Sequence, residues 1–156
     1  MSSQSGPPQH GLSAQEQGGP ALERELVILA LEARKRAYAP YSRFQVGAAI
    51  RTASGRVYLG CNVENGAFPM GICAERGAVC AAVAAGERSF THIAVVGDLP
   101  QPITPCGACR QVLAEVAPGI RVVMANTAGA VQTATIAELL PGAFSLPPAD
   151  PGREGA

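Results

Sequence analysis

Residues 73–124 read CAERGAVCAAVAAGERSFTHIAVVGDLPQPITPCGACRQVLAEVAPGIRVVM. Alanine-rich helical patterns alternate in this segment with short apolar runs that are typical of buried strands. Helices are predicted over 73–85 and 107–116, and strands over 93–96 and 120–124. Gly86 and Pro118-Gly119 stand where the two helices are expected to stop. Alternation of this kind is typical of a sheet covered by helices, an α/β domain.

The alternation continues on both sides of this segment. Upstream, an apolar stripe with helical spacing predicts a helix over 21–38, and a turn at Ser54-Gly55 joins two short strand patterns into a hairpin. The strands of this hairpin are predicted over 46–52 and 57–61. Downstream, a weaker strand pattern covers 130–135 and a short helical pattern covers 136–140. We therefore expect a three-layer α/β/α sandwich around a mixed sheet of about five strands.

The two ends of the chain differ in composition from its middle. Gly, Pro, Ser and Gln fill fifteen of the first twenty positions. Such a composition buries too little apolar surface to offset the entropy of ordering, so a disordered N-terminal tail is predicted over 1–20. A flexible C-terminal tail is predicted over 147–156 on the same grounds. The folded unit is then a single domain over 21–146, which is long enough to bury a core.

Charge and hydropathy exclude two classes of partner. Twelve Lys and Arg residues balance twelve Asp and Glu residues, so the formal net charge is zero. The chain thus lacks the basic surface with which proteins hold a phosphate backbone. Its longest apolar run, 78–85, is far shorter than the roughly 18 residues that a transmembrane helix needs. We expect neither a nucleic-acid partner nor a membrane partner.

The cysteines indicate the cellular compartment. There are five of them, an odd number, at positions 61, 73, 80, 106 and 109. The first twenty residues lack the basic start and the apolar stretch of a secretory signal. In a reducing compartment, cysteines at such spacings are metal ligands or small buried side chains rather than parts of disulfides. A cytoplasmic protein is expected.

Three of the cysteines form a candidate metal site. Cys106 and Cys109 are spaced C-x-x-C at the start of a predicted helix, and Cys73 stands at the start of another. The start of a helix favours negative charge, so both places should lower the pKa of a thiol and suit a metal-bound thiolate. Zinc is the metal that fits three thiolates best, and one ion per chain is predicted.

The type of zinc site depends on whether the protein supplies a fourth ligand. Cys80 follows Cys73 by seven positions on one helix, which separates them by roughly 10 Å along the axis. His10 lies in the tail, and His92, at the start of a buried strand, is interpreted as a structural histidine. Cys61 stays open as an alternative, although a cysteine at a strand end is typically a small buried side chain. Three ligands with an open fourth position are typical of catalytic zinc.

The two residues after the first ligand have the chemistry that such a site needs. Glu75 is expected to face the bound water without coordinating the metal, and to act first as general base and then as general acid. Three thiolates leave Zn²⁺ with a net charge of minus one, which weakens it as a Lewis acid. Arg76 is interpreted as a donor to the ligand sulfurs that restores this acidity, with a solvated arginine as the alternative.

These motifs resemble those of the zinc-dependent nucleoside and nucleotide deaminases, and most closely those of the small cytidine deaminases. Cys73-Ala74-Glu75 carries the resemblance, together with segments that follow in the order of that family. They are APYSRFQVGAA (39–49), GCNVEN (60–65), PCGACRQVL (105–113) and LLPGAF (139–144). A cysteine as the first ligand points to free cytidine, whereas a histidine would point to cytidylate, guanine or tRNA adenosine.

The resemblance implies a set of contacts to a nucleoside. Asn62 and Glu64 would hold the ribose, chiefly through its 3′-hydroxyl. Phe44 would pack against the pyrimidine ring; without the family, plain core packing would be the better interpretation of this residue. Ala74 would offer its backbone amide to the carbonyl of the base.

The resemblance also implies an assembly, because the short members of the family are homotetramers with sites shared between subunits. Phe144 is similar to the aromatic residue that such a subunit lends to its neighbour, and Phe68 lies in another segment that reaches a neighbouring site. Between its asparagine and its first ligand the family usually has small residues followed by Tyr-Gly. This chain has GAFPMG over 66–71 instead. Because Phe68 has no hydroxyl and Pro69 has no amide hydrogen, a contact to the 5′ end of the substrate is expected to be lost or rerouted.

The predicted function is hydrolytic, zinc-dependent deamination of cytidine and deoxycytidine to uridine and deoxyuridine, with release of ammonia, in pyrimidine salvage. One alternative is a deaminase of a modified cytosine nucleoside. A second, from another class, is a non-enzymatic interaction domain stabilised by zinc, which requires a fourth protein ligand. An editor of polynucleotides is disfavoured by the zero net charge and by the lack of a stripe of aromatic and basic residues.

Overall fold

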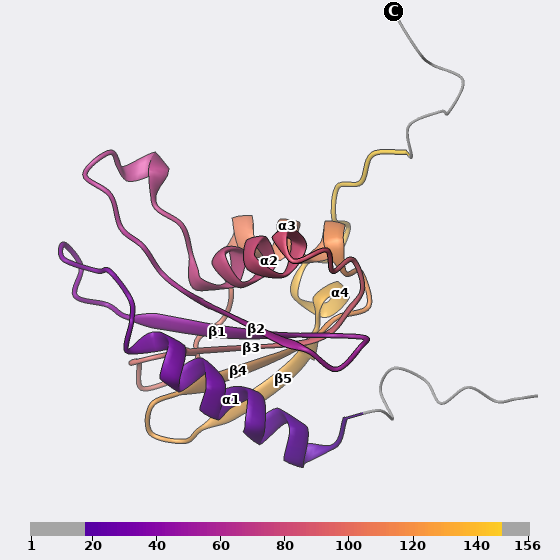
Figure 1. The fold of residues 1–156 in the computed structure, drawn as a ribbon, viewed down its shortest axis with the longest axis horizontal. Coiled ribbons are helices and arrows are strands. Elements are labelled where there is room, and N and C mark those ends of the chain that lie inside the picture. The colour runs from indigo at the N-terminus through magenta and orange to yellow at the C-terminus, as the bar shows by residue number, and fades with distance from the viewer. Residues whose placement is uncertain (1–17, 148–156) are drawn as a thin grey trace, which may run out of the picture.

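The computed structural model describes residues 18–147, which form one five-stranded sheet with helices on both faces (Figure 1). The helices are α1 (Pro20–Arg34), α2 (Ala74–Ala84), α3 (Gly107–Val116) and α4 (Ile136–Leu139), with a 3₁₀ turn η1 (Phe68–Met70). The strands are β1 (Val46–Thr52), β2 (Val57–Cys61), β3 (Phe90–Gly97), β4 (Arg121–Asn126) and β5 (Val131–Thr135). Most of the predicted tails, 1–17 and 148–156, lies outside the described residues, so the domain boundaries stay predictions.

The sheet is mixed, as predicted. Its order is β2-β1-β3-β4-β5. β1 runs antiparallel to β2 and to β3, while β3 and β4 are parallel, with His92 opposite Arg121 and Gly97 opposite Asn126. α3 makes the crossover between these parallel strands, which a hairpin turn is too short to make. The topology therefore brings the start of α3 to the same end of the sheet at which β3 finishes.

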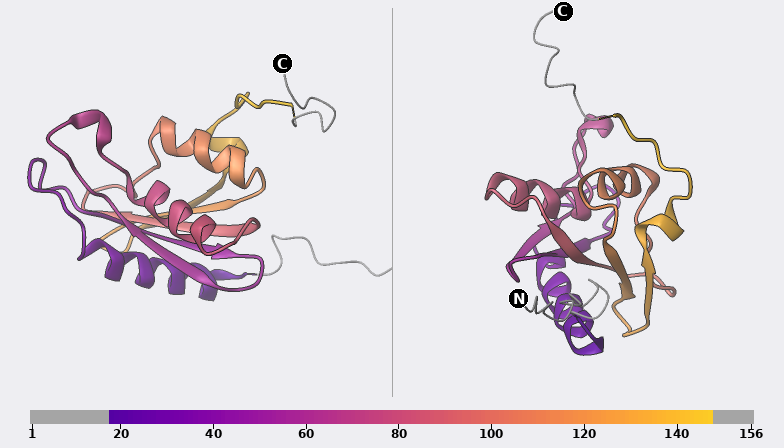
Figure 2. Two further views of the ribbon diagram at one scale, coloured as in Figure 1. Left: turned by 45° about the horizontal axis from the view of Figure 1, so that its top comes forward. Right: turned by 90° about the vertical axis from the view of Figure 1, so that its right-hand side faces the viewer.

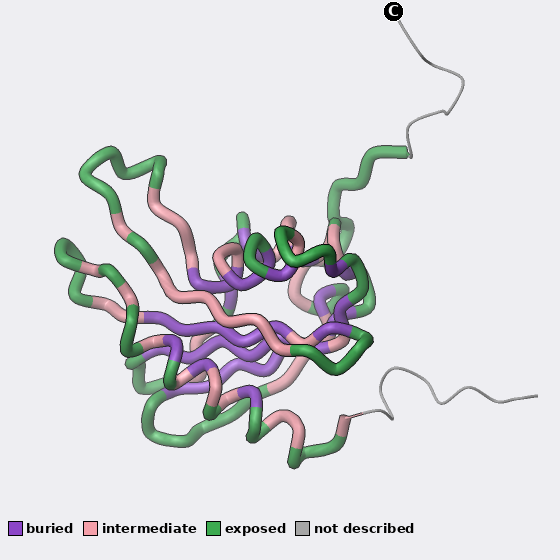
Figure 3. The backbone as a smooth tube through the Cα atoms, in the orientation of Figure 1, coloured by how far each residue is buried: buried purple, intermediate pink, exposed green. Residues whose placement is uncertain are grey.

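The helices divide into two layers. α1 covers one face of the sheet, α2 and α3 cover the other, and α4 lies beside the end of β5 (Figures 1 and 2). The buried side chains form two clusters accordingly, one under α1 with Leu26 and Val96, and a larger one under α2 and α3 with Ile50 and Leu113. Figure 3 shows the buried backbone concentrated in the central strands. These observations confirm the predicted three-layer α/β/α class.

Two glycines let the helices approach the sheet closely. A Cβ added at Gly47 of β1 would stand 2.0 Å from the carbonyl oxygen of Ala30 in α1. A Cβ added at Gly60 of β2 would stand 2.2 Å from the carbonyl oxygen of Ala74, the first residue of α2. Real Cβ atoms essentially never come this near to another atom, so each position requires glycine. Gly60 thereby sets the distance between β2 and the helix start that follows Cys73.

One boundary prediction is wrong. The apolar pattern predicts a helix as far as Tyr38, but α1 ends at Arg34. The backbone of Tyr38 pairs instead with the chain that leaves β2: its amide donates to the carbonyl of Asn62 (3.0 Å), and its carbonyl accepts from the amide of Glu64 (2.8 Å). A pairing between distant segments thus outweighs the local helical pattern. Among the described residues, no helix is both long and apolar enough to cross a membrane.

Candidate active site

Three cysteines meet where α2 and α3 begin. Cys73 is the N-cap residue of α2, Cys106 is the N-cap residue of α3, and Cys109 lies in the first turn of α3. Their Sγ atoms all lie within 4.8 Å of one another, and those of Cys73 and Cys106 are 3.9 Å apart. Two sulfurs bound tetrahedrally to one zinc at about 2.3 Å are about 3.8 Å apart. The donor type and the spacing both fit a zinc ion.

Of the other candidate ligands, those within the described residues are not part of this group. Within residues 18–147 the metal-ligating cluster consists of the three cysteines alone. Cys80 is exposed on α2, Cys61 ends β2, and His92 is fully buried on β3, under α1. His10 lies outside the described residues. The protein groups seen here thus leave the fourth position open, the arrangement that a catalytic zinc needs.

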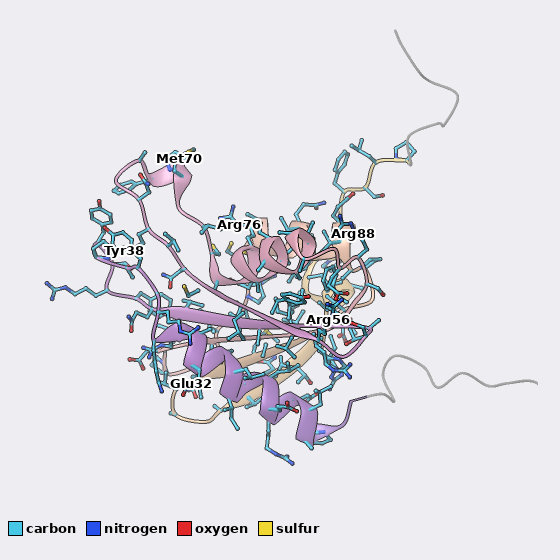
Figure 4. The ribbon with its side chains drawn as sticks, viewed as in Figure 1. Glu32, Tyr38, Arg56, Met70, Arg76 and Arg88 are labelled. Carbon is cyan, nitrogen blue, oxygen red and sulfur yellow. The ribbon has the colours of Figure 1, made fainter. Side chains whose placement is uncertain are left out.

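The cluster has an electropositive partner. Arg76 donates from Nη2 to the Sγ of Cys73 (3.8 Å) and to the carbonyl of Gly71 (3.3 Å), and Figure 4 shows it beside the sulfur atoms at the start of α2. A hydrogen bond from the Cys109 thiol, supported by Arg76, lowers the pKa of Cys73 to about 5. The same bond raises the pKa of Cys109, because that thiol is the donor to Cys73. The arginine lies where it can offset thiolate charge.

Glu75 is the buried acid of the site. Its exposure is 5%, although it belongs to the first turn of α2 and borders the cavity described below. Burial, reinforced by the charge of Cys73, raises the pKa of this carboxyl to about 7. A carboxyl group with a pKa near neutrality exists in both protonation states, and it can therefore accept a proton and return it.

A cavity of about 670 Å³ opens beside the cysteines. Ligand pockets commonly measure about 300–1,000 Å³, so this one is large enough for a nucleoside. Its lining includes five of the residues predicted to contact substrate, together with Glu75, Cys73 and Cys106; the five are Phe44, Asn62, Glu64, Phe68 and Ala74. Ile103 and Thr104, for which the sequence predicts no role, also line it because they precede Cys106 in the loop that enters α3.

Asn62 connects the end of β2 to the segment that enters β1. Its Oδ1 accepts a hydrogen bond from the amide of Val46 (2.8 Å), and its Nδ2 donates to the carbonyl of Phe44 (2.8 Å). The side chain therefore fixes the backbone on which the Phe44 ring is carried. One Nδ2 hydrogen and one Oδ1 lone pair stay available for a ligand.

Glu64 connects the same two segments two residues later. Its Oε2 accepts from the amides of Tyr41 (2.9 Å) and Ser42 (3.2 Å), and its Oε1 accepts from the Ser42 hydroxyl. The bond from the Ser42 hydroxyl is the main cause of the lowered pKa of Glu64. Ser42 lies in segment 39–49, which resembles the family, but the resemblance predicts no role for it. A short polar residue directly after Pro40-Tyr41 is the signal that could have found it.

The two aromatic residues predicted to reach a neighbouring subunit lie in different places. Phe68 is 80% exposed at the edge of the cavity, with its ring edge-on to Tyr41 and the ring centroids 6.4 Å apart. Phe144 is 68% exposed and does not line the cavity of its own chain. It borders instead a smaller hollow of about 290 Å³ beside α4.

The chain is similar to proteins of one family. Residues 21–126 match the family described as "Cytidine and deoxycytidylate deaminase zinc-binding region". A "Cytidine deaminase" of Sporosarcina psychrophila is 50% identical over 122 residues, 78% of this chain and 90% of that protein. The Mycobacterium tuberculosis "Cytidine deaminase" is 41% identical over 117 residues, 75% of this chain and 85% of that protein. The crystal structure of cytidine deaminase from Burkholderia pseudomallei has a TM-score of 0.76 at 50% identity, covering 78% of this chain and 98% of that one.

Proposed function

The chain belongs to the cytidine and deoxycytidylate deaminase family, and from this premise we propose that it converts cytidine and deoxycytidine to uridine and deoxyuridine. The observation that carries the proposal is a buried carboxyl group, Glu75, beside three clustered thiols at a nucleoside-sized cavity. In this reaction a C4–O bond forms from water, the C4–N bond breaks, and ammonia leaves.

Cys73, Cys106 and Cys109 hold the zinc ion. When bound, zinc lowers the pKa of a water molecule to about 7, which makes that water a nucleophile at neutral pH. Arg76 donates to the ligand sulfur of Cys73 and offsets the negative charge that three thiolates leave on the site.

Glu75 moves the protons. Its carboxylate takes a proton from the attacking water and gives it to ring N3, which makes C4 more electrophilic. Glu75 then takes the remaining proton of the oxygen added at C4 and gives it to the departing amino group, so that a carbonyl is left at C4 as ammonia leaves. A pKa raised to about 7 by burial suits both steps, since a group with that pKa is neither a very weak base nor a very weak acid at neutral pH.

The other cavity residues bind and orient the nucleoside. Asn62 and Glu64 hold the ribose, chiefly its 3′-hydroxyl, and Phe44 packs against the pyrimidine. Ala74 offers its backbone amide to the carbonyl of the base. It is the first residue of α2, where a backbone amide has no partner within the helix. All four residues line the cavity, which supports these roles.

The test is direct. Purified protein incubated with cytidine should release uridine and ammonia, and removal of the metal with a chelator should abolish this release until zinc is restored. A panel that adds deoxycytidine and modified cytosine nucleosides separates the proposed substrates from the alternative. Full zinc occupancy without turnover of any cytosine nucleoside would favour the zinc-stabilised interaction domain.

We also propose a homotetramer whose sites are shared between subunits. Large apolar side chains exposed at two places support this assembly. Phe68 and Met70 lie on the 3₁₀ turn η1, and Phe144 and Leu146 lie beyond α4. Burying Phe144 against a neighbouring site would cover about 150 Å² or more of apolar surface.

Mixed oligomers test the sharing. Chains carrying Phe144→Ala should be co-refolded with chains carrying Glu75→Gln. Some sites then receive one intact copy of each residue and should recover activity that neither parent shows. Activity no higher than the sum of the two separate preparations, or a fully active monomer on sizing, would contradict shared sites.

The setting that we propose is pyrimidine salvage in the cytoplasm. Three thiols that must stay reduced to hold zinc support a reducing compartment. Fractionation of cells with an antibody to the chain would check this location.

A further inference from the structure

Part of the cavity lining comes from two segments that lie about twenty residues apart in the sequence. Residues 41–46 enter β1, and residues 62–64 leave β2. The side chains of Asn62 and Glu64, two positions apart, bind the first segment at its two ends. Ser42, at the end that Glu64 holds, lines the cavity and has no part in the mechanism above.

The Ser42 hydroxyl makes two hydrogen bonds of fixed direction. It donates its single proton to Oε1 of Glu64, and it accepts the amide proton of Phe44 at 3.0 Å. A hydroxyl has one proton to give and two lone pairs, so this pair of bonds satisfies its donor capacity. The result is a continuous path from the Phe44 backbone through Ser42 to the carboxylate. Its last bond is charge-assisted, the stronger kind of hydrogen bond.

The backbone beside Ser42 needs this support. Arg43 has a φ of +57°, the one positive φ at a non-glycine residue in the described chain. A long side chain in the left-handed region carries a conformational cost that its surroundings must offset. The hydrogen bonds of Ser42 hold the chain on both sides of Arg43. Phe44, whose amide donates to the Ser42 hydroxyl, follows Arg43. Glu64, which accepts from that hydroxyl, also accepts from the amide of Tyr41, which precedes Arg43.

We propose that Ser42 is a positioning residue that joins the sugar contact to the base contact. Its hydroxyl aims the Glu64 carboxylate at the ribose and, through the Phe44 amide, fixes the ring that packs on the pyrimidine. This inference rests on the proposed function. It predicts that the two halves of the nucleoside are bound as one unit, so that loss of the hydroxyl weakens both contacts.

The first test is Ser42→Ala, with Ser42→Thr as the variant that keeps the hydroxyl. We expect Ser42→Ala to raise KM for cytidine about tenfold, the effect of losing one hydrogen bond to a charged group. The kcat should stay within about threefold, because Glu75 and the thiols lie on other elements. Ser42→Thr should return KM to within threefold of the wild-type value. The matched control is Ser54→Ala, which removes a turn hydroxyl bonded to Thr52 far from the cavity.

A double-mutant comparison separates positioning from a general loss of structure. In a Glu64→Ala background the path is already cut at its carboxylate end, so adding Ser42→Ala should raise KM less than twofold further. Calorimetric binding of the product uridine to the zinc-loaded protein should show the same dependence in Kd, without reference to turnover. Equal effects of Ser42→Ala in both backgrounds would overturn the inference, as would a single variant with KM and Kd within twofold of wild type.

The two proposals fail in distinguishable ways. A wild type that forms no uridine contradicts the proposed function, and the Kd values then still decide the role of Ser42. A wild type that neither turns over cytidine nor binds uridine overturns both. An active wild type whose Ser42→Ala variant is unchanged overturns the role of Ser42 alone.

Discussion

The two ends of the cavity are built in opposite ways. At the metal end, each ligand stands at or just after the start of a helix, and α2 rests directly on Gly60 of β2. At the end that we propose binds the ribose, here called the sugar end, the side chains of Asn62 and Glu64 hold an exposed loop through hydrogen bonds to its backbone. Regular elements fix a reacting geometry within narrow limits, whereas loops bring together distant parts of the chain for recognition.

This difference predicts different kinetic signatures for the two ends. A change at the metal end removes interactions made in the transition state and should lower kcat. A change at the sugar end removes binding shared by substrate and transition state, and it should raise KM with little change in kcat. Variants that break this division would show that the ends are not independent.

The largest effect is expected for Glu75→Gln. An amide of the same shape cannot carry protons, so kcat should fall at least about 100-fold while zinc content and fold are retained. Uridine formation and metal analysis on the same preparation measure both. Glu115→Gln, an exposed position on α3, is the matched control. Turnover within a few-fold of wild type would remove Glu75 from the mechanism.

A substitution under a helix should come next in size. Gly60→Ala places a Cβ against the Ala74 carbonyl and must displace the start of α2. We expect a loss of about 1–3 kcal/mol in the free energy of unfolding, together with lower kcat because Cys73 and Glu75 move with the helix. Urea titration and steady-state kinetics measure the two effects.

The other face of the sheet supplies the comparison for this variant. Gly47→Ala should destabilise the fold similarly, since its Cβ would meet the backbone of α1, but it should leave kcat of the folded fraction unchanged. Gly119→Ala is the control because nothing lies within 4 Å of an added Cβ, and it should change neither the stability nor kcat. Equal losses of kcat in the Gly47 and Gly60 variants would contradict a specific role for the α2 start.

At the sugar end, Asn62→Ala should raise KM about tenfold. The variant leaves the Val46 amide and the Phe44 carbonyl without their partner, and one such loss is worth about 1–3 kcal/mol. Because the metal ligands are untouched, kcat should change less than threefold. Gln132→Ala on β5, exposed and outside the cavity lining, is the control. A fall in kcat larger than the rise in KM would contradict the division between the ends.

The same division explains what the sequence could predict. The residues of the metal end could be predicted from the sequence because each of them lies next to a helix start. The C-x-x-C and Cys-x-Glu spacings that mark them are local patterns. The fold class followed from alternating helix and strand patterns for the same reason. The end of α1 at Arg34 and the hydrogen bond from Ser42 to Glu64 depend on pairings between segments far apart in the chain. A local pattern can mark Ser42 as a polar residue in a turn, but it does not encode the partner in either pairing.

The smallest effect is expected at a buried histidine outside the cavity lining. His92 is fully buried on β3, and neither of its ring nitrogens has a hydrogen-bond partner among residues 18–147. It is packed near Glu23 of α1, Arg51 of β1 and Arg121 of β4. The sequence predicts a structural histidine; its burial agrees, but its nitrogens have no partner in the described part of the chain. Burial, reinforced by Arg51, holds its pKa below the ordinary value of 6.5.

The sign of the pH effect follows from this lowered pKa. As pH falls through 6.5, the unfolded chain takes up a proton at His92 before the folded chain does, so the free energy of unfolding should decrease. His92→Leu removes the titrating group, and it breaks no hydrogen bond within residues 18–147. Its stability at pH 7 should therefore equal or exceed that of wild type, and its advantage should grow between pH 7 and pH 5. Urea titrations across that range measure the difference.

Because His92 lies on the α1 face, KM and kcat at pH 7 should stay within twofold of wild type. Stability curves that run parallel would show that His92 does not titrate differently on folding. A changed KM or kcat would show that the sheet face under α1 is coupled to the cavity, which lies on the opposite face.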